Sequence, residues 1–506
     1  MRGGFRAMRR RMHFRRRSCR GFGYPLLRFA AGLRRASSPT VNTSAPATPL
    51  PASPASAWAV FGNRRIAAIL LLGFSSGLPL ALTAGTLQAW LTVEGLSLKA
   101  IGFATLVGQA YVFKFLWSPP MDRWAVPVWG RWLGRRRGWL LLAQICLAAA
   151  LAAMAVVGVP GPDQASAWPG LVHAAQALGV DAPSARAVPL MLLAVGVAFF
   201  SASQDIVIDA YRTDLLPAPE RSAGAAVMVL GYRLAMIVSG GLALWLASDV
   251  TGWRGLYALM AGLMAALTLA TLWAPRPHPH DPAAAGGPSP IRAAPRTLRE
   301  AVVEPLHEFF TRRGAWALLL AIVFYKLGDA FAGALSTTFL IRGVGFDPAQ
   351  VGLVNKSMGL AATIFGALLG GALQARLGLW RALLLFGVLQ GASNLAYWVL
   401  AVSAKSLPLM AMAVGVENLT GGMGTAAFVA LLSALCDVRY SATQFALLSA
   451  LSAVGRVYVG PATGYLVDAM GWPAFYLFTV AAAVPGVALI ALLRRPIVAR
   501  ERIGPD

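Results

Sequence analysis

Long apolar stretches recur along this chain from residue 66 to residue 495. Each is about 20 residues long, which is enough to cross the ~30 Å hydrocarbon core of a bilayer as a helix. Inside lipid the backbone must satisfy its own hydrogen bonds, so such stretches form helices. Only 13% of the 506 residues are charged, whereas a soluble domain carries roughly 25%. The sequence therefore predicts an all-α membrane protein.

The apolar stretches fall into two groups of six, which predicts about twelve transmembrane helices. The first group is expected at 66–91, 99–117, 138–160, 188–211, 222–247 and 253–273. The second group is expected at 315–341, 349–373, 380–402, 408–436, 442–468 and 473–495. The chain then divides into a basic N-terminal extension that is expected to be disordered (1–65), a six-helix bundle (66–273), an inter-half loop (274–314), a second six-helix bundle (315–495) and a tail (496–506).

The net charge of +24 comes mostly from basic residues outside the apolar stretches. Twelve arginines lie in residues 1–35, and most loop Lys and Arg residues follow the even-numbered predicted helices. This distribution is typical of cytoplasmic loops and argues against a nucleic-acid-binding protein. Both termini and the inter-half loop are therefore expected in the cytoplasm. In that loop, Thr297 and Glu300 have the spacing of a capping box and predict an amphipathic surface helix.

The two groups of helices repeat each other. Residues 97–102 begin the second predicted helix as residues 347–352 begin the eighth, and both segments open with a good N-cap residue and end in glycine. The spacing from Gly241 to Trp253 and Tyr257 recurs from Gly460 to Trp472 and Tyr476. A parallel repeat of this kind predicts two related halves with a substrate site between them.

Ionisable residues inside the predicted helices are the strongest functional signal. Each costs roughly 2.5–3.5 kcal/mol at a helix centre on insertion scales, so such residues normally face a wet cavity or pair with one another. We expect those of both halves to converge on one polar cavity. They are Lys114, Asp205, Asp209, Arg233, Lys326, Asp329, Lys356, Glu417 and Arg456.

Spacing suggests roles for some of these groups. Asp205 and Asp209 share a helix face, and two neighbouring carboxylates resist ionising together, which suits proton binding and release. An interfacial salt network with Arg212 is the alternative for Asp209. Lys326 and Asp329 are expected to neutralise each other, and Glu417 has no partner that the sequence can choose.

The candidate sites follow from these roles. The proton-coupling candidates are Asp205, Asp209, Asp329 and Glu417. The substrate-binding candidates are Gln109, Tyr111, Lys114, Gln204, Arg233, Lys326, Asn394 and Arg456. The basic residues slightly outnumber the acidic ones, which favours an anionic solute, and the amides and phenols suit sugar hydroxyls and peptide groups.

Eight long segments of the chain resemble the AmpG muropeptide permeases, a family of the major facilitator superfamily. They are residues 73–91, 108–124, 201–211, 231–248, 325–332, 339–347, 417–433 and 441–462. The Arg-rich leader departs from the family pattern, and so does the absence of helices after the twelfth that some members carry. Neither departure touches the membrane core that carries the resemblance.

The resemblance implies import of N-acetylglucosaminyl-1,6-anhydro-N-acetylmuramyl peptides from periplasm to cytoplasm for peptidoglycan recycling and β-lactamase induction. It also implies a bacterial inner-membrane protein that is driven by the proton gradient and has no other cofactor. The expected partners are a small glycopeptide and the bilayer, and the expected state is a monomer. Transport of another anionic metabolite or of a drug is the alternative function.

An enzyme is not expected, because all five histidines lie in predicted tails or loops and no metal-binding or nucleophile motif occurs in a helix. The histidines are His13, His173, His278, His280 and His307. A sensor that binds a ligand without transporting it is a further alternative.

Overall fold

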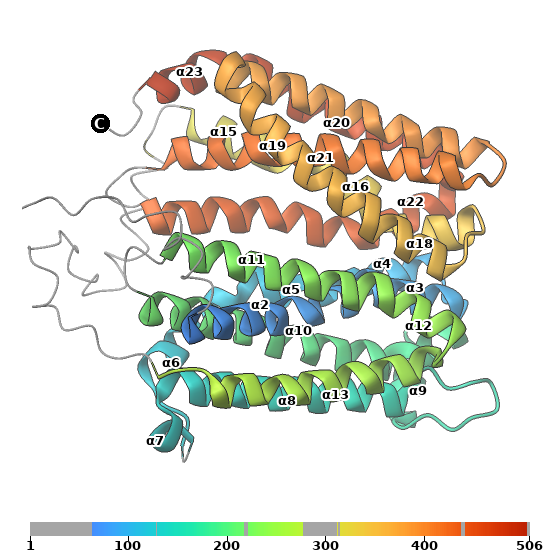
Figure 1. The fold of residues 1–506 in the computed structure, drawn as a ribbon. Helices are drawn as coiled ribbons and strands as arrows, with labels where there is room; N and C mark the ends of the chain where they lie inside the picture. Colours follow the sequence, from blue (N-terminus) through green and yellow to red (C-terminus); the bar gives the residue numbers. More distant parts are fainter. Residues whose placement is uncertain are drawn as a thin grey trace, which may run out of the picture. The chain divides into compact units, whose positions relative to one another are not determined.

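Long α-helices that run side by side form a bundle in the computed structural model of this chain (Figure 1). The structure describes residues 63–127, 129–216, 221–276, 311, 314–436 and 441–502, which all belong to one compact unit, 53–506. The predicted extension (except residues 63–65) and the predicted surface helix at Thr297 lie outside these residues.

The first half contains the described helices up to residue 273. They are α2 (Arg64–Leu82), α3 (Gly85–Val93), α4 (Leu98–Ala104), α5 (Gln109–Phe113), α6 (Ser118–Arg123), α7 (Trp129–Leu133), α8 (Arg135–Val157), α9 (Pro169–Ala177), α10 (Ala182–Leu215), α11 (Arg221–Ile237), α12 (Ala243–Asp249) and α13 (Gly252–Trp273).

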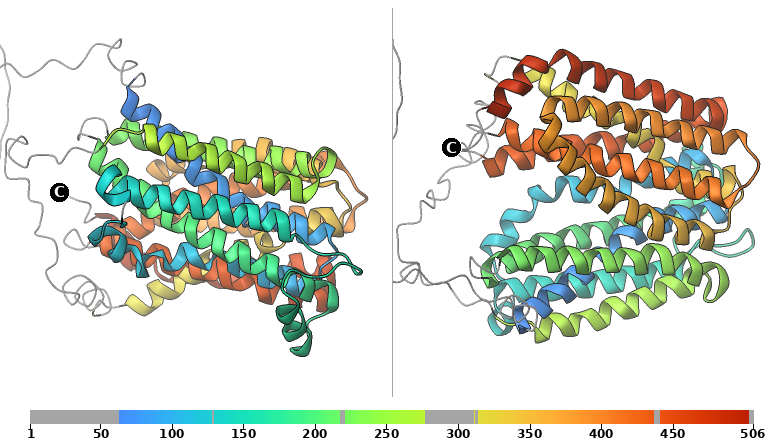
Figure 2. Two further views of the ribbon diagram at one scale, coloured as in Figure 1. Left: turned by 90° about the horizontal axis from the view of Figure 1, so that it is seen from below. Right: turned by 45° about the horizontal axis from the view of Figure 1, so that its top comes forward.

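The second half contains the remaining helices. They are α15 (Ala315–Tyr325), α16 (Leu327–Ala334), α17 (Ser336–Thr338), α18 (Pro348–Val354), α19 (Leu360–Leu377), α20 (Leu379–Val402), α21 (Leu407–Leu435), α22 (Ser441–Leu492) and α23 (Arg494–Arg502). The right-hand view in Figure 2 shows the two halves as separate groups of helices that meet along one interface.

Ten helical stretches of the described residues are long and apolar enough to cross a membrane. The stretch Leu98–Phe113 is apolar but shorter, and α22 contains a non-helical residue, Gly471 (φ 74°, ψ 167°), at which two helices meet. When α22 is counted as two crossings and the shorter stretch is included, the described residues account for the twelve predicted helices. The all-α membrane fold is confirmed.

Some predicted helices are interrupted. The stretch predicted as one helix at 99–117 consists of α4, a 3₁₀ turn η2 (Thr105–Gly108), α5 and a second 3₁₀ turn η3 (Lys114–Leu116). The helix predicted at 315–341 breaks at Lys326 and at Leu335, where the backbone leaves helical geometry (φ −102° and −119°). Such distortions within a helix often mark functional positions.

Among the described residues, three π-helical turns are a further departure from the regular helices expected. They are η5 (Val238–Leu242), η8 (Phe339–Gly343) and η9 (Asn355–Gly359). The short helix α9 was also not predicted; Pro169 at its first position has the backbone angle that starts a helix.

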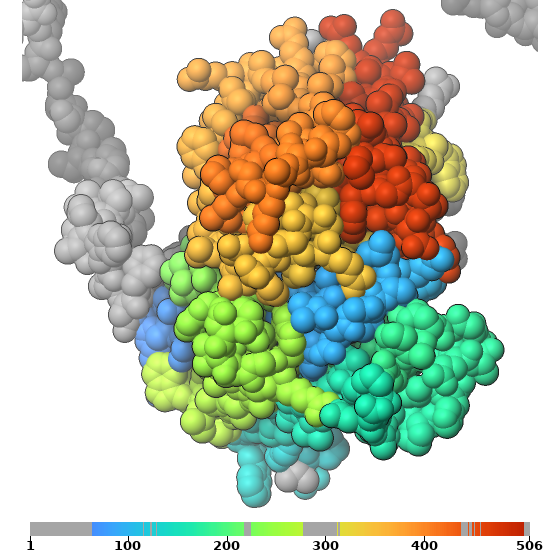
Figure 3. All heavy atoms as spheres, turned by 90° about the vertical axis from the view of Figure 1, so that its right-hand side faces the viewer, coloured from blue at the N-terminus to red at the C-terminus, as the bar shows by residue number. Residues whose placement is uncertain are grey.

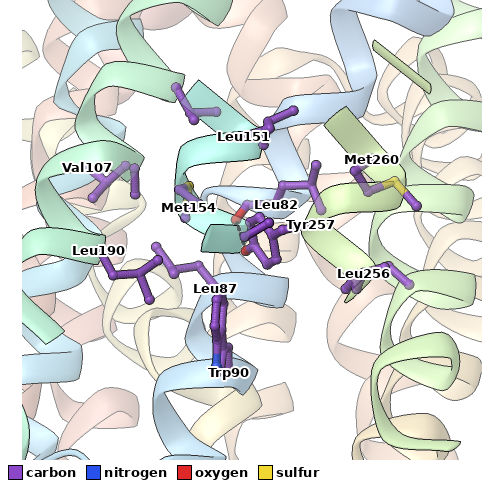
Figure 4. Close-up of a cluster of buried hydrophobic side chains, with 14 of the residues drawn as sticks. Leu82, Leu87, Trp90, Val107, Leu151, Met154, Leu190, Leu256, Tyr257 and Met260 are labelled. Carbon is purple, nitrogen blue, oxygen red and sulfur yellow. Dashed lines mark hydrogen bonds between the residues drawn. The ribbon is translucent and has the colours of Figure 1, made fainter. Parts of the chain in front are cut away.

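Each half has its own aromatic core. In the first half the rings of Trp90 and Tyr257 lie 4.9 Å apart, and the Tyr257 hydroxyl donates a hydrogen bond to the Leu82 carbonyl at 2.7 Å (Figure 4). In the second half the rings of Tyr397 and Tyr476 stack at 5.3 Å. Tyr257 and Tyr476 are the last residues of the repeated spacing, so the repeat places the same side chain in both cores.

The repeated glycines lie where the halves touch. A Cβ on Gly102 would lie 2.5 Å from the Gly460 oxygen, and a Cβ on Gly352 would lie 3.0 Å from the Gly241 oxygen. In the sequence repeat Gly102 corresponds to Gly352, and Gly241 corresponds to Gly460. The two contacts are therefore related by the repeat, because each half contributes the same two positions to the interface.

Hydrogen bonds and an ion pair connect the two halves at one end of the bundle. We call the end where α8 and α15 begin the basic end, and the opposite end, with α9 and α18, the far end (Figure 1). At the far end Arg342 donates to the carbonyls of Leu96 and Thr92 at 2.7 and 2.8 Å, and Lys99 pairs with Asp468 at 2.9 Å. Figure 3, which faces this end, shows the atoms of the two halves meeting.

Candidate functional site

A cavity of about 540 Å³ lies between the halves. Its lining comes from both halves and combines small residues with hydroxyl, amide and charged side chains. The polar lining residues are Thr83, Gln88, Thr105, Tyr111, Lys326, Asp329, Ser336, Thr337, Thr363, Glu417, Asn418 and Thr425. The volume and the few convergent polar groups are those of a small-molecule site.

Three charged side chains form a cluster in this cavity, which we call the charged cluster: Lys326, Asp329 and Glu417. The Lys326 ammonium lies 3.6 Å from an Asp329 carboxylate oxygen, as the i, i+3 spacing predicts. The carboxyl groups of Asp329 and Glu417 lie close enough to act on each other electrostatically. Two neighbouring carboxylates resist ionising together, so one of them holds a proton more readily. The cluster can therefore hold a proton between two acids beside a cation.

Neighbouring groups fix the members of the charged cluster in place. The Lys326 ammonium also donates to Gln390 Oε1 at 3.1 Å and to Thr425 Oγ1 at 3.3 Å. Asn418 Nδ2 donates to Glu417 Oε2 at 2.8 Å. Gln390 comes from α20 and Thr425 from α21. The interruption of the helix at Lys326, between α15 and α16, therefore places the Lys326 side chain among three helices.

The N-terminal half contributes a different kind of group to the cavity. The Tyr111 hydroxyl is buried and has no hydrogen-bond partner among the described residues. Gln88 lines the cavity and donates to the Ala334 carbonyl of the other half at 2.7 Å. Tyr111 is thus a predicted binding residue that the structure brings to the cavity with its polar group unused.

Asp205 lies within the first half and not on the cavity lining. It accepts a hydrogen bond from the Ser76 hydroxyl at 2.5 Å. Lys114 and Asp209 are the charged groups that act on it. Asp205 is thus held on the α2 side of α10, whereas the charged cluster belongs to the second half.

Asp209 is separated from the cavity as well. Its side chain is 54% exposed and pairs with Arg212 at 3.6 Å. The neighbouring Asp214 pairs with Arg136 at 2.9 Å. The geometry favours the salt-network alternative for Asp209 over the proton-coupling role.

The other binding candidates are not on the cavity lining. Gln204 and Asn394 are buried, and neither amide has a hydrogen-bond partner among the described residues. Gln109 begins α5, and Arg233 on α11 contacts the Met236 sulfur at 4.0 Å. Arg456 lies on α22, and its side chain is not among those described.

The expectation that ionic groups of both halves converge on the cavity was wrong for the lining described. The charged lining residues all come from the second half. The first half keeps Asp205 and Lys114 inside its own bundle. Helical spacing locates charges on a helix face but does not say which face meets the other half, so this asymmetry could not be read from the sequence.

Several uncharged polar lining residues were not among the predicted binding candidates. Thr83, Gln88, Thr105, Asn418 and Thr425 are ordinary polar residues of transmembrane helices. Such side chains commonly bond to their own helix backbone, as Thr425 does to the Gly421 carbonyl at 2.7 Å. The sequence signals were the amide of Gln88 at membrane depth and the position of Asn418 directly after Glu417.

The fold and the cavity between its halves are those of a secondary transporter. A family model described as Major Facilitator Superfamily matches residues 112–401. The chain is 58% identical over 436 residues to the anhydromuropeptide permease of Escherichia coli (strain K12), which covers 86% of this chain and 81% of that protein. The chain belongs to the major facilitator superfamily and, within it, to the family of the anhydromuropeptide permease.

Two further comparisons agree with this assignment. An uncharacterised protein of Haemophilus influenzae is 33% identical over 84% of this chain and 93% of that protein. The solved structure of a bacterial homologue of the human lysosomal transporter Spinster, in an inward-facing and unoccupied conformation, matches with a TM-score of 0.58 at 16% identity. That match covers 89% of this chain and 99% of the other and shows the shared fold.

Proposed function

We propose that this protein imports anhydromuropeptides across the bacterial inner membrane, driven by protons, with the basic end in the cytoplasm. The 58% identity to the Escherichia coli permease supports the substrate class. The position of the basic loops supports the orientation. In this orientation the far end faces the periplasm, and its hydrogen bonds and ion pair hold the transporter closed on that side.

The observation that carries the proton coupling is the charged cluster in the cavity between the halves. With one proton shared by Asp329 and Glu417, the charges of these acids and of Lys326 sum to zero. Without it the cluster carries a net negative charge in a low-dielectric site, which is unfavourable. A neutral cluster lets the halves rock past the site, so protonation permits the change of access.

The rest of the lining suits the uncharged parts of such a solute. Thr83, Gln88 and Thr105 present hydroxyl and amide groups, which match sugar hydroxyls, acetamido groups and peptide bonds. Substrate carboxylates would be attracted by the cations near the cavity. Binding in the middle of the bundle, between two rocking halves, is how alternating access works in this fold.

Uptake into proteoliposomes tests the proposal. Labelled anhydromuropeptide should accumulate when a pH gradient, acidic on the far side, is imposed, and should only equilibrate without it. Glu417→Gln and Asp329→Asn should abolish accumulation while substrate exchange continues. Asp209→Asn, which changes an exposed carboxylate outside the lining, should accumulate normally.

Each contrary outcome has a separate meaning. Normal accumulation by Glu417→Gln and Asp329→Asn would refute proton coupling through the charged cluster. If Asp205→Asn loses accumulation while Glu417→Gln and Asp329→Asn retain it, the proton site would be assigned to the first half. Competition by unrelated anionic metabolites or drugs, but not by anhydromuropeptide, would replace the proposed substrate.

A further inference from the structure

Lys356 is a cation in the membrane core that the proposed mechanism does not use. It lies on the π-turn η9, and its side chain passes over Gly240 and Gly241 of the π-turn η5 in the other half. A Cβ on Gly240 would lie 2.9 Å from the Lys356 Nζ, and a Cβ on Gly241 would lie 2.9 Å from the Lys356 Cβ. An alanine at either position would force the Lys356 side chain to move from this path.

The Lys356 ammonium has no hydrogen-bond or ion-pair partner among the described residues. The charged group that acts on it is Arg233 of the first half, which is another cation. Lys326 shows the contrast, because it has Asp329, Gln390 and Thr425 around it. A partly buried cation beside a second cation is costly unless an anion arrives.

The surroundings of Lys356 connect it to the main cavity. A second cavity of about 290 Å³ is lined by Lys356, Asn355 and Tyr397 of the second half and by Met236 and Gly240 of the first. Glu417 and Asn418 line both cavities. The Glu417 carboxyl interacts with Asp329 and Asn418, and no ion pair joins it to Lys356 among the described residues. A solute in the main cavity can extend a group into the second one.

We propose that Lys356 binds a carboxylate of the substrate, with Arg233 adding positive potential from the other half. This inference rests on the proposed function, and it assigns the carboxylate to the peptide part, because the sugars of an anhydromuropeptide carry no charge. The bound carboxylate sits where η5 and η9 meet. Substrate binding thus ties the two halves together at this interface.

Equilibrium binding to the purified protein separates this inference from the proposed function. The ligands are an anhydromuropeptide and the same molecule with its carboxyl groups converted to amides. The wild type should prefer the acid by roughly tenfold to a hundredfold, which is the usual strength of a hydrogen bond to a charged group. Lys356→Met, which removes the charge and shortens the side chain by one atom, should lose most of the preference for the acid and should bind the acid nearly as weakly as the wild type binds the amide.

A second variant, Gly240→Ala, keeps the charge of Lys356 but displaces its side chain. Gly240→Ala should also lose the preference for the acid, because the new methyl group occupies the path of the Lys356 side chain. In a Lys356→Ala background, Gly240→Ala should have no further effect on binding. Gly196→Ala is the matched control, since a Cβ there meets nothing within 4 Å.

The outcomes are distinct. If the wild type binds neither ligand, the proposed substrate is wrong. If the wild type prefers the acid and Lys356→Met or Gly240→Ala retains that preference, the proposed substrate stands and the role of Lys356 is refuted. Elution of each variant as a single species in gel filtration excludes misfolding as the cause of a loss.

Discussion

Substituting Gly102 by alanine should open the far end of the interface between the halves. A Cβ at this position would lie 2.5 Å from the Gly460 oxygen and 3.3 Å from the Pro461 Cα. Both are backbone atoms, so the overlap is relieved only when α22 moves away from α4. Overpacking of this kind costs about 1–3 kcal/mol.

This cost falls on one state of the transporter. The contact of Gly102 with Gly460 belongs to the arrangement in which the far end is closed, and it is lost when the halves separate there. A destabilisation of about 1–3 kcal/mol shifts a two-state equilibrium by roughly 5- to 150-fold. Gly102→Ala should therefore populate the state that is open at the far end.

Cysteine labelling measures this shift. Ser336 lines the cavity, and Ser336→Cys, in a background with Cys19, Cys146 and Cys436 replaced by serine, should react slowly with a membrane-impermeant thiol reagent added from the far side. Gly102→Ala should raise the labelling rate, and Gly196→Ala, whose Cβ meets nothing within 4 Å, should not. Equal rates in the two variants at equal membrane levels would refute the reasoning.

Two other substitutions test the far end and the repeated core. Arg342→Ala removes the hydrogen bonds to the Leu96 and Thr92 carbonyls without adding a clash, so it should raise labelling at position 336 by about threefold to tenfold; an unchanged rate would show that these bonds do not hold the halves together. Tyr257→Phe should lower the free energy of unfolding by about 1 kcal/mol, because the Leu82 carbonyl loses its buried donor, and thermal unfolding in detergent measures this. Tyr476→Phe is the matched control at the equivalent position of the repeat, because the Tyr476 hydroxyl has no hydrogen-bond partner among the described residues, and an equal loss in both variants would contradict the assignment.

The fold could be predicted from the sequence because lipid leaves the backbone few choices. Apolar length predicted the helices, and the repeat predicted two related halves. The sequence did not show that the repeated glycines Gly102, Gly460, Gly352 and Gly241 lie where the halves touch. The breaks at Lys326 and Leu335 and the π-turns η5 and η9 could not be predicted. They depend on what each helix meets across an interface, and a sequence pattern within one helix carries no such information.

For the site, as for the fold, the sequence predicted contacts within one segment but not contacts between helices. The spacing of Lys326 and Asp329 predicted their ion pair, because Lys326 is the N-cap of α16 and Asp329 lies in the first turn of that helix. The partner of Glu417 could not be chosen, because it comes from a different helix. Asp205 and Asp209 were expected to act together from their spacing, but Asp205 faces Ser76 and Asp209 faces Arg212. The rotation of each helix about its axis within the bundle determines the partners of Glu417, Asp205 and Asp209, and the sequence of one helix does not give this rotation.

The distribution of charge between the halves gives the two halves different tasks. Of the described residues that line the two cavities, the charged ones all belong to the second half, and the first half offers hydroxyl and amide groups such as Gln88 and Tyr111. Under the proposed function, the second half would hold the proton and the substrate carboxylate, and the first half would contact the uncharged sugars. A solute that carries both kinds of group makes its full set of contacts only when it touches both halves. A sugar without a peptide would lose the contact where η5 and η9 meet, and a peptide without a sugar would lose the contacts to the hydroxyl and amide groups of the first half. Each fragment should therefore shift the equilibrium between the two states less than the complete solute, because a ligand shifts an equilibrium only by its differential contacts.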